Sequence, residues 1–434
     1  MKFKIHRGTQ EIGGSCVEIW TNTTHLVIDF GLPLVNPDRT PFNSRTLKHR
    51  TTKALIEEGI LPDIPGLYQG SPEVSLLLSH AHQDHYGLIN YIDPDSNIYL
   101  GEATHKLIEL TNLFTCQDWT INNPHYFKSG KTFTIGDIKI TPYLMDHSAF
   151  DAYAFLIEAD GKSLFYSGDF RSHGRKSKSF EWFSHNVKSG VDFLLLEGTT
   201  LGRVEQSFQT ETDIENDLVS TFTNDKGPHL IYTSGQNIDR LVSIFRACRR
   251  SGKILVLDVY IANVLKTLSA YGRLPYPSRD FPEIRVFFPY RLSGMISSQG
   301  QKEMLYQFKD YKITKNQLSD QADQIVMTVR PSMQGDLELI DNLDGGQFIF
   351  SIWEGYKEEG RTKDFLDYVA SRGLKETQLH TSGHADQATL QRMVDILEPK
   401  NIVPIHTFEG NKYETVFSGE SIVRIGDGEI VILT

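Results

Sequence analysis

Seven consecutive residues, Ser79-His80-Ala81-His82-Gln83-Asp84-His85, contain three histidines and an aspartate. They follow Val74-Ser75-Leu76-Leu77-Leu78, an apolar run that is typical of a buried strand. Imidazole and carboxylate groups are the donors that zinc takes in proteins. A strand that ends in a ligand-rich loop holds such donors rigidly and leaves coordination positions open to water. The spacing predicts that the first two histidines reach one metal ion and the Asp84-His85 pair reaches a second.

The length of 434 residues is too great for one ordinary hydrophobic core, which predicts two compact units. Apolar residues make up 39% of the chain and charged residues 23%, as in a globular enzyme. No stretch approaches the ~18–20 apolar residues of a membrane span, and the N-terminus has no signal-peptide pattern. Cys16, Cys116 and Cys248 are too few and too far apart for a disulfide framework or a cysteine metal site. We therefore expect a cytoplasmic protein that has no membrane partner.

The net charge of −11 argues against broad, nonspecific binding to nucleic acids. It remains compatible with an enzyme that grips one nucleic-acid strand in a local groove. Metal-binding carboxylates contribute part of this charge, which bound zinc would offset.

The chain changes character along its length. Residues 1–205 read mainly as strands, with hairpin turns at Gly136-Asp137 and Asp160-Gly161. Residues 206–360 alternate between strands and helices, which indicates a parallel α/β unit. The tail, 361–434, returns to the first domain. We therefore expect a domain made of the first and last segments, with the α/β domain of the middle segment inserted into it.

Three further candidate ligands stand at the ends of other predicted strands. His147 follows an apolar strand, Asp169 follows a strand and Gly168, and His406 follows a third strand. Taken alone, His147 is equally well explained as a core or capping histidine, and Asp169 as a turn residue. Beside the histidine-rich cluster, both become candidate ligands.

His384 follows Gly383, and we expect it to begin a helix. The backbone amides at that helix start would then suit an anion. The alternative is a residue at a helix start that has no chemical role.

The motifs together resemble a known family. The early motifs resemble the metallo-β-lactamase fold, and their residues are His80, His82, Asp84, His85, His147 and Asp169, with Asp29 closing an early strand. The late motifs resemble the three signature motifs of the β-CASP nucleases, and they centre on Glu197, Ser382-Gly383-His384 and Pro404-Ile405-His406. Two further segments resemble ribonuclease J, namely Gly8–Gly14 and Gln236–Arg240. The resemblance therefore spans nearly the whole chain.

The resemblance implies how two zinc ions would be held, although manganese also suits such donors. One ion would take His80, His82 and His147. The other would take Asp84, His85 and His406, and Asp169 would bridge the two.

The resemblance also implies roles around the metals. Asp29 and Glu197 would orient the ligands and the water. His384 would touch the scissile phosphate or protonate the leaving oxygen. The catalytic candidates are therefore Asp84, Glu197 and His384, and the phosphate- or RNA-binding candidates are Ser382, Gly383, His384, Asn237 and Arg240.

We therefore expect an α/β protein, with a metallo-β-lactamase αββα sandwich and an inserted β-CASP-like α/β domain. The expected activity is zinc-dependent hydrolysis of phosphodiester bonds in single-stranded RNA or oligonucleotides, because a histidine in the last motif is typical of RNA-directed β-CASP members. Two alternatives stay open: a small-molecule metallo-hydrolase acting on a phosphodiester, thioester or lactone, and a non-catalytic binding relative. A homo-oligomer is also left open.

Overall fold

The structure is a computed structural model that describes residues 1–68, 70, 73–203 and 207–433. It divides into two compact units. The first comprises Met1–Asn112, Gln117–Ser207 and Gly383–Thr434, and the second comprises Leu113–Cys116 and Phe208–Ser382.

The return to the first unit differs from the expected position. It lies at Gly383 and not at residue 361, because α12 (Gly360–Ser371) and β17 (Lys375–Gln378) belong to the second unit. β17 pairs in parallel with β16 (Gln347–Phe350), which holds it in the second sheet. The other expected boundary, between residues 205 and 206, lies outside the described residues.

The first unit contains two sheets. The seven-stranded sheet has the order β19-β1-β2-β3-β4-β5-β6. Its strands are β1 (Lys2–Arg7), β2 (Cys16–Trp20), β3 (His25–Ile28), β4 (Val74–Leu77), β5 (Asn97–Leu100), β6 (Asn123–Tyr126) and β19 (Ile430–Ile432). Its β4 is the apolar run before the histidine-rich cluster, and it pairs in parallel with β3 and β5.

The six-stranded sheet of the first unit has the order β18-β11-β10-β9-β8-β7. Its strands are β7 (Phe133–Ile135), β8 (Ile138–Met145), β9 (Ala152–Ala159), β10 (Lys162–Tyr166), β11 (Phe193–Glu197) and β18 (Ile402–Ile405). Both expected hairpins are present, because β7 pairs antiparallel with β8, and β9 with β10. Asp160 and Gly161 both have positive φ, as the tight turn between β9 and β10 requires.

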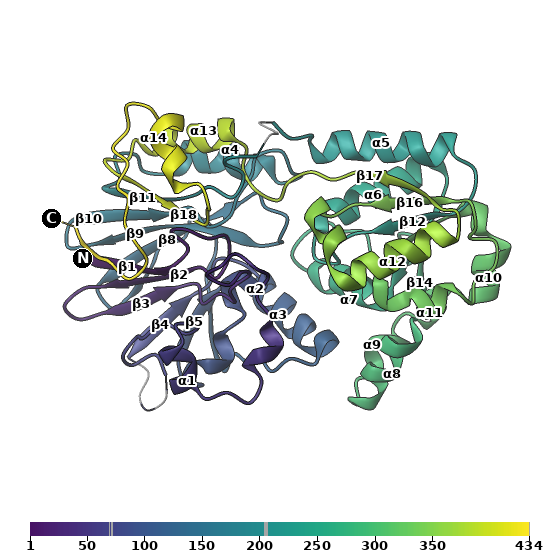
Figure 1. The fold of residues 1–434 in the computed structure, drawn as a ribbon, viewed down its shortest axis with the longest axis horizontal. Coiled ribbons are helices and arrows are strands. Elements are labelled where there is room, and N and C mark those ends of the chain that lie inside the picture. The colour runs from purple at the N-terminus through teal and green to yellow at the C-terminus, as the bar shows by residue number, and fades with distance from the viewer. Residues whose placement is uncertain (69, 71–72, 204–206, 434) are drawn as a thin grey trace. The chain divides into compact units, whose positions relative to one another are not determined.

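Apolar side chains of the two sheets face each other and form a shared core, which includes Phe3, Ile28, Phe155 and Leu195. Helices cover the outer faces, as Figure 1 shows. They are α1 (Thr52–Glu57) and α3 (Glu102–Thr115) on the seven-stranded side, and α4 (Ser177–Asn186), α13 (Gln387–Leu397) and α14 (Tyr413–Val416) on the other. The short α2 (Gln83–Tyr86) lies in the ligand loop after β4. This αββα arrangement confirms the predicted fold class.

The second unit is built on one parallel sheet with the order β14-β13-β15-β12-β16-β17. Its remaining strands are β12 (His229–Tyr232), β13 (Ile254–Asp258), β14 (Ile284–Phe287) and β15 (Ile325–Val329). Its remaining helices are α5 (Glu211–Asn224), α6 (Ile238–Ser251), α7 (Val259–Leu268), α8 (Tyr290–Ser298), α9 (Glu303–Tyr306), α10 (Lys315–Asp320) and α11 (Gln334–Leu337). Among the described residues, no helix is both long and apolar enough to cross a membrane.

Strand direction explains where the candidate ligands of the first unit stand. β10, β11 and β18 are mutually parallel, and β8 runs the same way because both β8 and β10 are antiparallel to β9. Their carboxyl ends therefore meet at one edge of the sheet. His147, Asp169, Glu197 and His406 all lie at or just past those ends.

Gly31 allows the metal-ligand loop to pack against the turn after β3. Phe30 N donates to His85 O at 2.7 Å, and Leu32 N donates to Gln83 O at 2.9 Å. A Cβ on Gly31 would overlap the backbone carbonyl of Asp84. Because the backbone itself occupies that space, only glycine fits here without moving the loop.

We expect Gly31→Ala to lower the free energy of unfolding by about 1–3 kcal/mol, as overpacking against fixed backbone does. Chemical denaturation of the two proteins measures this difference. Gly410→Ala is the control, because a Cβ there meets nothing closer than 3.5 Å. An equally small loss in both variants would contradict the tight packing at Gly31.

Candidate metal centre

Three histidines of the first unit form the first group of candidate ligands. His80 follows β4, His82 is the residue before α2, and His147 follows β8. One ring nitrogen from each lies within 4.8 Å of the others, and His147 Nε2 is 3.2 Å from His82 Nδ1. Convergence of three imidazoles at this distance suits one metal ion.

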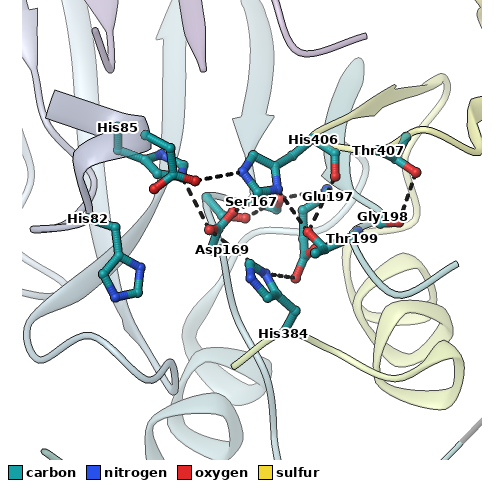
Figure 2. Close-up of polar contacts among 12 residues, drawn as sticks. His82, His85, Ser167, Asp169, Glu197, Gly198, Thr199, His384, His406 and Thr407 are labelled. Carbon is teal, nitrogen blue, oxygen red and sulfur yellow. Dashed lines mark hydrogen bonds and ion pairs between the residues drawn. The ribbon is translucent and has the colours of Figure 1, made fainter. Parts of the chain in front are cut away.

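A second group joins Asp84, His85, Asp169 and His406. Asp169 Oδ2 is 3.2 Å from His85 Nε2 and 3.8 Å from His80 Nε2, so this carboxylate lies between the two groups. His406 Nε2 is 3.3 Å from Asp84 Oδ2. Figure 2 shows Asp169 next to both His85 and His406.

Asp29, which is fully buried after β3, orients His85. Its Oδ2 accepts hydrogen bonds from His85 Nδ1 and Tyr166 OH, each at 2.7 Å. Its two oxygens also accept bonds from the backbone N and the hydroxyl of Ser79. Because Nδ1 of His85 donates to Asp29, its Nε2 is the nitrogen that faces Asp169 and the other candidate ligands.

His80 supplies the clearest test of whether a metal fits. The Ser79 hydroxyl donates to Asp29, so it accepts from His80 Nδ1 at 3.0 Å. This places the lone pair of His80 on Nε2. That atom is buried and has no hydrogen-bond partner among the described residues. A buried polar atom without a partner is costly, and a metal ion at Nε2 would remove that cost.

The ring of His147 is oriented by a carbonyl far along the chain. His147 Nδ1 donates to Gly383 O at 2.6 Å, which leaves Nε2 directed at His82. The residue before it, Asp146, accepts backbone hydrogen bonds from Arg171 at its carbonyl and from Gly174 at its carboxylate. These bonds attach the end of β8 to the loop that carries Asp169.

Asp169 depends on the glycine before it. Gly168 has φ +52, and a Cβ there would lie 2.6 Å from the Tyr153 carbonyl on β9. Glycine therefore lets the loop after β10 turn closely over the sheet, which directs the Asp169 carboxylate toward the histidines.

His406 is held from two sides. Its backbone N donates to Gly8 O at 2.6 Å, and its Nδ1 lies 2.8 Å from the hydroxyl of Thr199. Because Nδ1 is engaged with Thr199, Nε2 faces Asp84. Its φ of 51° is unusual for a residue other than glycine and marks a constrained backbone at this position.

Glu197 orients neighbouring segments of the chain and is shielded from solvent. Its carboxylate accepts bonds from Thr199 N at 3.0 Å and Ala385 N at 3.3 Å, and the residue is buried. His384 Nδ1 lies 3.5 Å from Glu197 Oε1 and 3.8 Å from Asp169 Oδ2. The side chain of His384 is 21% exposed, so this ring borders solvent. Figure 2 shows the His384 ring directed at Glu197.

The first group is neutral in the absence of a metal. Burial lowers the pKa of His80 and His147 well below the ordinary value, and the neighbouring histidines add to this effect. Burial likewise lowers the pKa of His82 to about 4. At neutral pH these three rings therefore present lone pairs that need no deprotonation before they bind a metal.

The second group is charged. Burial opposes charge on His85, but Asp169, Asp29 and Asp84 outweigh it and raise the pKa of His85 well above the ordinary value. Burial also opposes charge on Asp84, but His85 and His406 outweigh it and lower the pKa of that carboxyl. Without a metal, this half of the site is held together by pairs of imidazolium and carboxylate.

The structure brings all seven predicted ligands into these two groups and places Asp29 and Glu197 beside them. The expected helix start at His384 is wrong, because α13 begins at Gln387. The Asp386 carboxylate accepts from Thr389 N and so caps that helix. His384 therefore lies in the loop before α13, and Asp386, not His384, caps that helix.

The predicted direct phosphate contact of Arg240 does not fit the second unit. The residue is fully buried, and its guanidinium pairs with Glu211 at 3.1 Å and donates to the Ser351 and Leu379 carbonyls. The Asn237 side chain accepts from Arg240 N and so caps α6. Ser382 is buried as well, and the phosphate-binding roles of Ser382, Gly383 and Asn237 stay predictions.

Sequence reasoning missed the residues that orient the ligands, namely Ser79, Asp146, Tyr166 and Thr199. Ser79 and Asp146 had a usable signal, because each directly precedes a candidate histidine. Tyr166 and Thr199 had none, because their partners lie more than 100 positions away along the chain.

The donor set, histidine nitrogens with carboxylates, is that of a divalent-metal site. Two family models match the chain. The beta-lactamase superfamily domain matches residues 65–224, and the Zn-dependent metallo-hydrolase RNA specificity domain matches residues 374–412.

Several characterised proteins are similar over most of the chain. Ribonuclease J of Mycoplasma genitalium is 22% identical over 98% of this chain and 72% of its own length. Ribonuclease J2 of Bacillus subtilis is 20% identical over 92% of this chain and 68% of its own length. A crystal structure of a protein of unknown function from Enterococcus faecalis covers 100% of this chain and 99% of that one, with a TM-score of 0.80 and 21% identity. The chain thus has the metallo-β-lactamase fold and is similar to ribonuclease J proteins over most of its length.

Proposed function

We propose that this protein is a ribonuclease that uses two zinc ions to hydrolyse phosphodiester bonds in single-stranded RNA. The observation that carries the proposal is the pair of adjacent ligand groups, with the Asp169 carboxylate lying between them. His80, His82 and His147 would hold one ion, and Asp84, His85 and His406 the other. The Lewis-acid chemistry that such ions supply is activation of the phosphodiester and of the attacking water.

The protein's own contribution is orientation. Asp29 holds Nδ1 of His85, Ser79 holds Nδ1 of His80, and Gly383 O holds Nδ1 of His147. Each contact leaves the Nε2 atom for a metal and prevents the ring from rotating. A site assembled this way is pre-organised, which lowers the cost of binding charged groups.

We assign the proton transfer to His384. Its Nδ1 lies toward the carboxylates of Glu197 and Asp169, which would hold a proton on that nitrogen. Its Nε2 would then contact the phosphate or donate a proton to the leaving oxygen. An imidazole suits this role at neutral pH.

Two findings support RNA as the substrate. The late segment around His384 and His406 matches an RNA specificity domain, and the similar proteins are named ribonuclease J. A homo-oligomer and a cytoplasmic location stay predictions.

We expect purified protein to contain close to two zinc ions per chain and to lose RNA hydrolysis when a chelator removes them. His82→Ala should lose metal from the first group and at least ~100-fold of activity, since changes to outer contacts alone cost 10–100-fold. Elemental analysis and hydrolysis of end-labelled single-stranded RNA measure both quantities.

His185→Ala is the matched control, because His185 is exposed on α4 and its hydrogen bonds to described residues are local, to Ser184 and Glu181 O. It should keep both metal and activity. RNA cleavage that persists in the chelated protein would contradict the proposal. A metal-loaded protein that spares RNA but splits a thioester or lactone would instead favour the small-molecule hydrolase.

We expect His384→Ala to keep both metal ions yet to lose ~10²–10⁴-fold in kcat, the usual contribution of a positioned acid. Elemental analysis measures the metal content. The pH profile of kcat should lose the limb that the general acid produces. Loss of metal in this variant would show that His384 is a ligand, and an unchanged kcat would remove it from the chemistry.

A further inference from the structure

A pocket of about 720 Å³ lies in the first unit. Four chain segments line it, contributing Thr9 and Gln10, Arg39, Pro404 and Phe408–Asn411, and Arg424–Gly426 with Glu429. Its volume falls within the ~300–1,000 Å³ of pockets that hold small organic ligands. None of the mechanistic roles above uses this pocket.

Short links connect the pocket wall to His406. Gly8 O, next to Thr9, accepts the backbone N of His406 at 2.6 Å. Phe408 stands two positions after His406. Thr9 is itself attached to the last wall segment, because its N and Oγ1 donate to Asp427 Oδ1 at 3.1 and 2.8 Å. A ligand in the pocket would therefore lie close to a residue of the proposed metal site.

Two arginines make the pocket suited to an anion. Arg39 and Arg424 are both exposed, and no carboxylate of the described residues forms an ion pair with either. Both guanidinium groups are therefore available to an anion in solution. Guanidinium groups bind phosphate oxygens in a forked geometry.

The backbone at Arg39 has an unusual conformation, which a hydrogen-bonded turn stabilises. It has φ +65, a conformation that costs energy for a residue other than glycine. The neighbouring Asp38 carboxylate holds that turn by accepting from Thr40 N at 2.9 Å and Thr40 Oγ1 at 2.6 Å. The turn places the Arg39 guanidinium 5.0 Å from the centre of the Phe408 ring.

The pocket also offers groups for a base and a sugar. Phe408 is half-buried and presents an aromatic surface, and a guanidinium stacked on it extends that surface. Bases stack on such aromatic and guanidinium planes. Glu429 and Glu409 add acceptors for hydroxyl or amino groups, although Glu409 also pairs with Lys412 at 3.3 Å. Guanidinium N–H donors for a phosphate, an aromatic surface for a base and carboxylate acceptors for hydroxyl or amino groups together match a nucleotide better than a bare phosphate.

We propose that this pocket is a subsite for one nucleotide, which binds its phosphate at Arg39 and Arg424 and packs its base on Phe408. The proposal rests on the proposed ribonuclease function. The nucleotide has two sources: a residue of the RNA chain beside the scissile bond, or a released nucleoside monophosphate.

The test is equilibrium binding of a labelled single-stranded RNA to the full chain in chelator, where no cleavage occurs. We expect Arg39→Ala/Arg424→Ala to weaken binding about tenfold. The slope of log K against log salt should also become shallower by ~0.7, because the two arginines bind one phosphate and each lost phosphate contact on single strands contributes ~0.7. Competition with uridine 5′-monophosphate separates the sources: competition that needs the two arginines indicates a free nucleotide, and its absence indicates a nucleotide within the chain.

Arg273→Ala/Arg279→Ala is the matched control, since both arginines are exposed and the loss of charge is identical. It should leave affinity and salt slope unchanged. Photo-crosslinking of a 4-thiouridine RNA should label the peptide that contains Phe408 in the wild type.

Wild-type protein that binds and cleaves RNA, with equal affinity in the two double variants and no label on the Phe408 peptide, would overturn the subsite. In that case the ribonuclease proposal would stand. Wild-type protein that neither binds nor cleaves RNA would overturn the proposed function itself.

Discussion

The buried carboxylate of Asp29 is the interaction on which the rest of the site depends. It stands after β3, accepts two bonds from Ser79 after β4, and accepts a third from Tyr166 at the end of β10. One charged group thus joins the two sheets. Burial of a carboxylate is costly unless hydrogen bonds compensate it, and here four donors do so. The same bonds fix the tautomer of His85 directly and that of His80 through Ser79.

A second constraint is the common direction of four strands. β8, β10, β11 and β18 end at one edge, so side chains that are more than 250 positions apart in sequence meet there. Loops alone would not hold seven candidate ligands at distances of a few ångströms. The backbone at that edge both pairs in the sheet and carries the candidate ligands. The stability of the sandwich and the geometry of the site are therefore coupled.

The ligands could be predicted from sequence because their signal is local, a polar donor at the end of an apolar strand. The predictions that the structure contradicts also have physical explanations. His384 was expected to begin a helix, but Asp386 is the stronger cap and α13 starts after it. The second unit was expected to end at 360, but β17 is a polar, mostly exposed strand without apolar alternation. Arg240 is a buried ion-pair partner of Glu211, and that pairing has no trace in the sequence.

Charge placement links chemistry and recognition in this protein. An acidic surface repels a polyanion everywhere except where cations are concentrated. The proposed metal centre and the two arginines of the proposed subsite both lie in the first unit, and the bond from His406 N to Gly8 O joins their walls. An RNA strand attracted to both would be aligned by them, because the intervening backbone fixes the spacing. The net negative charge of the protein would then favour this alignment of the RNA strand, because it makes contacts of RNA elsewhere on the protein unfavourable.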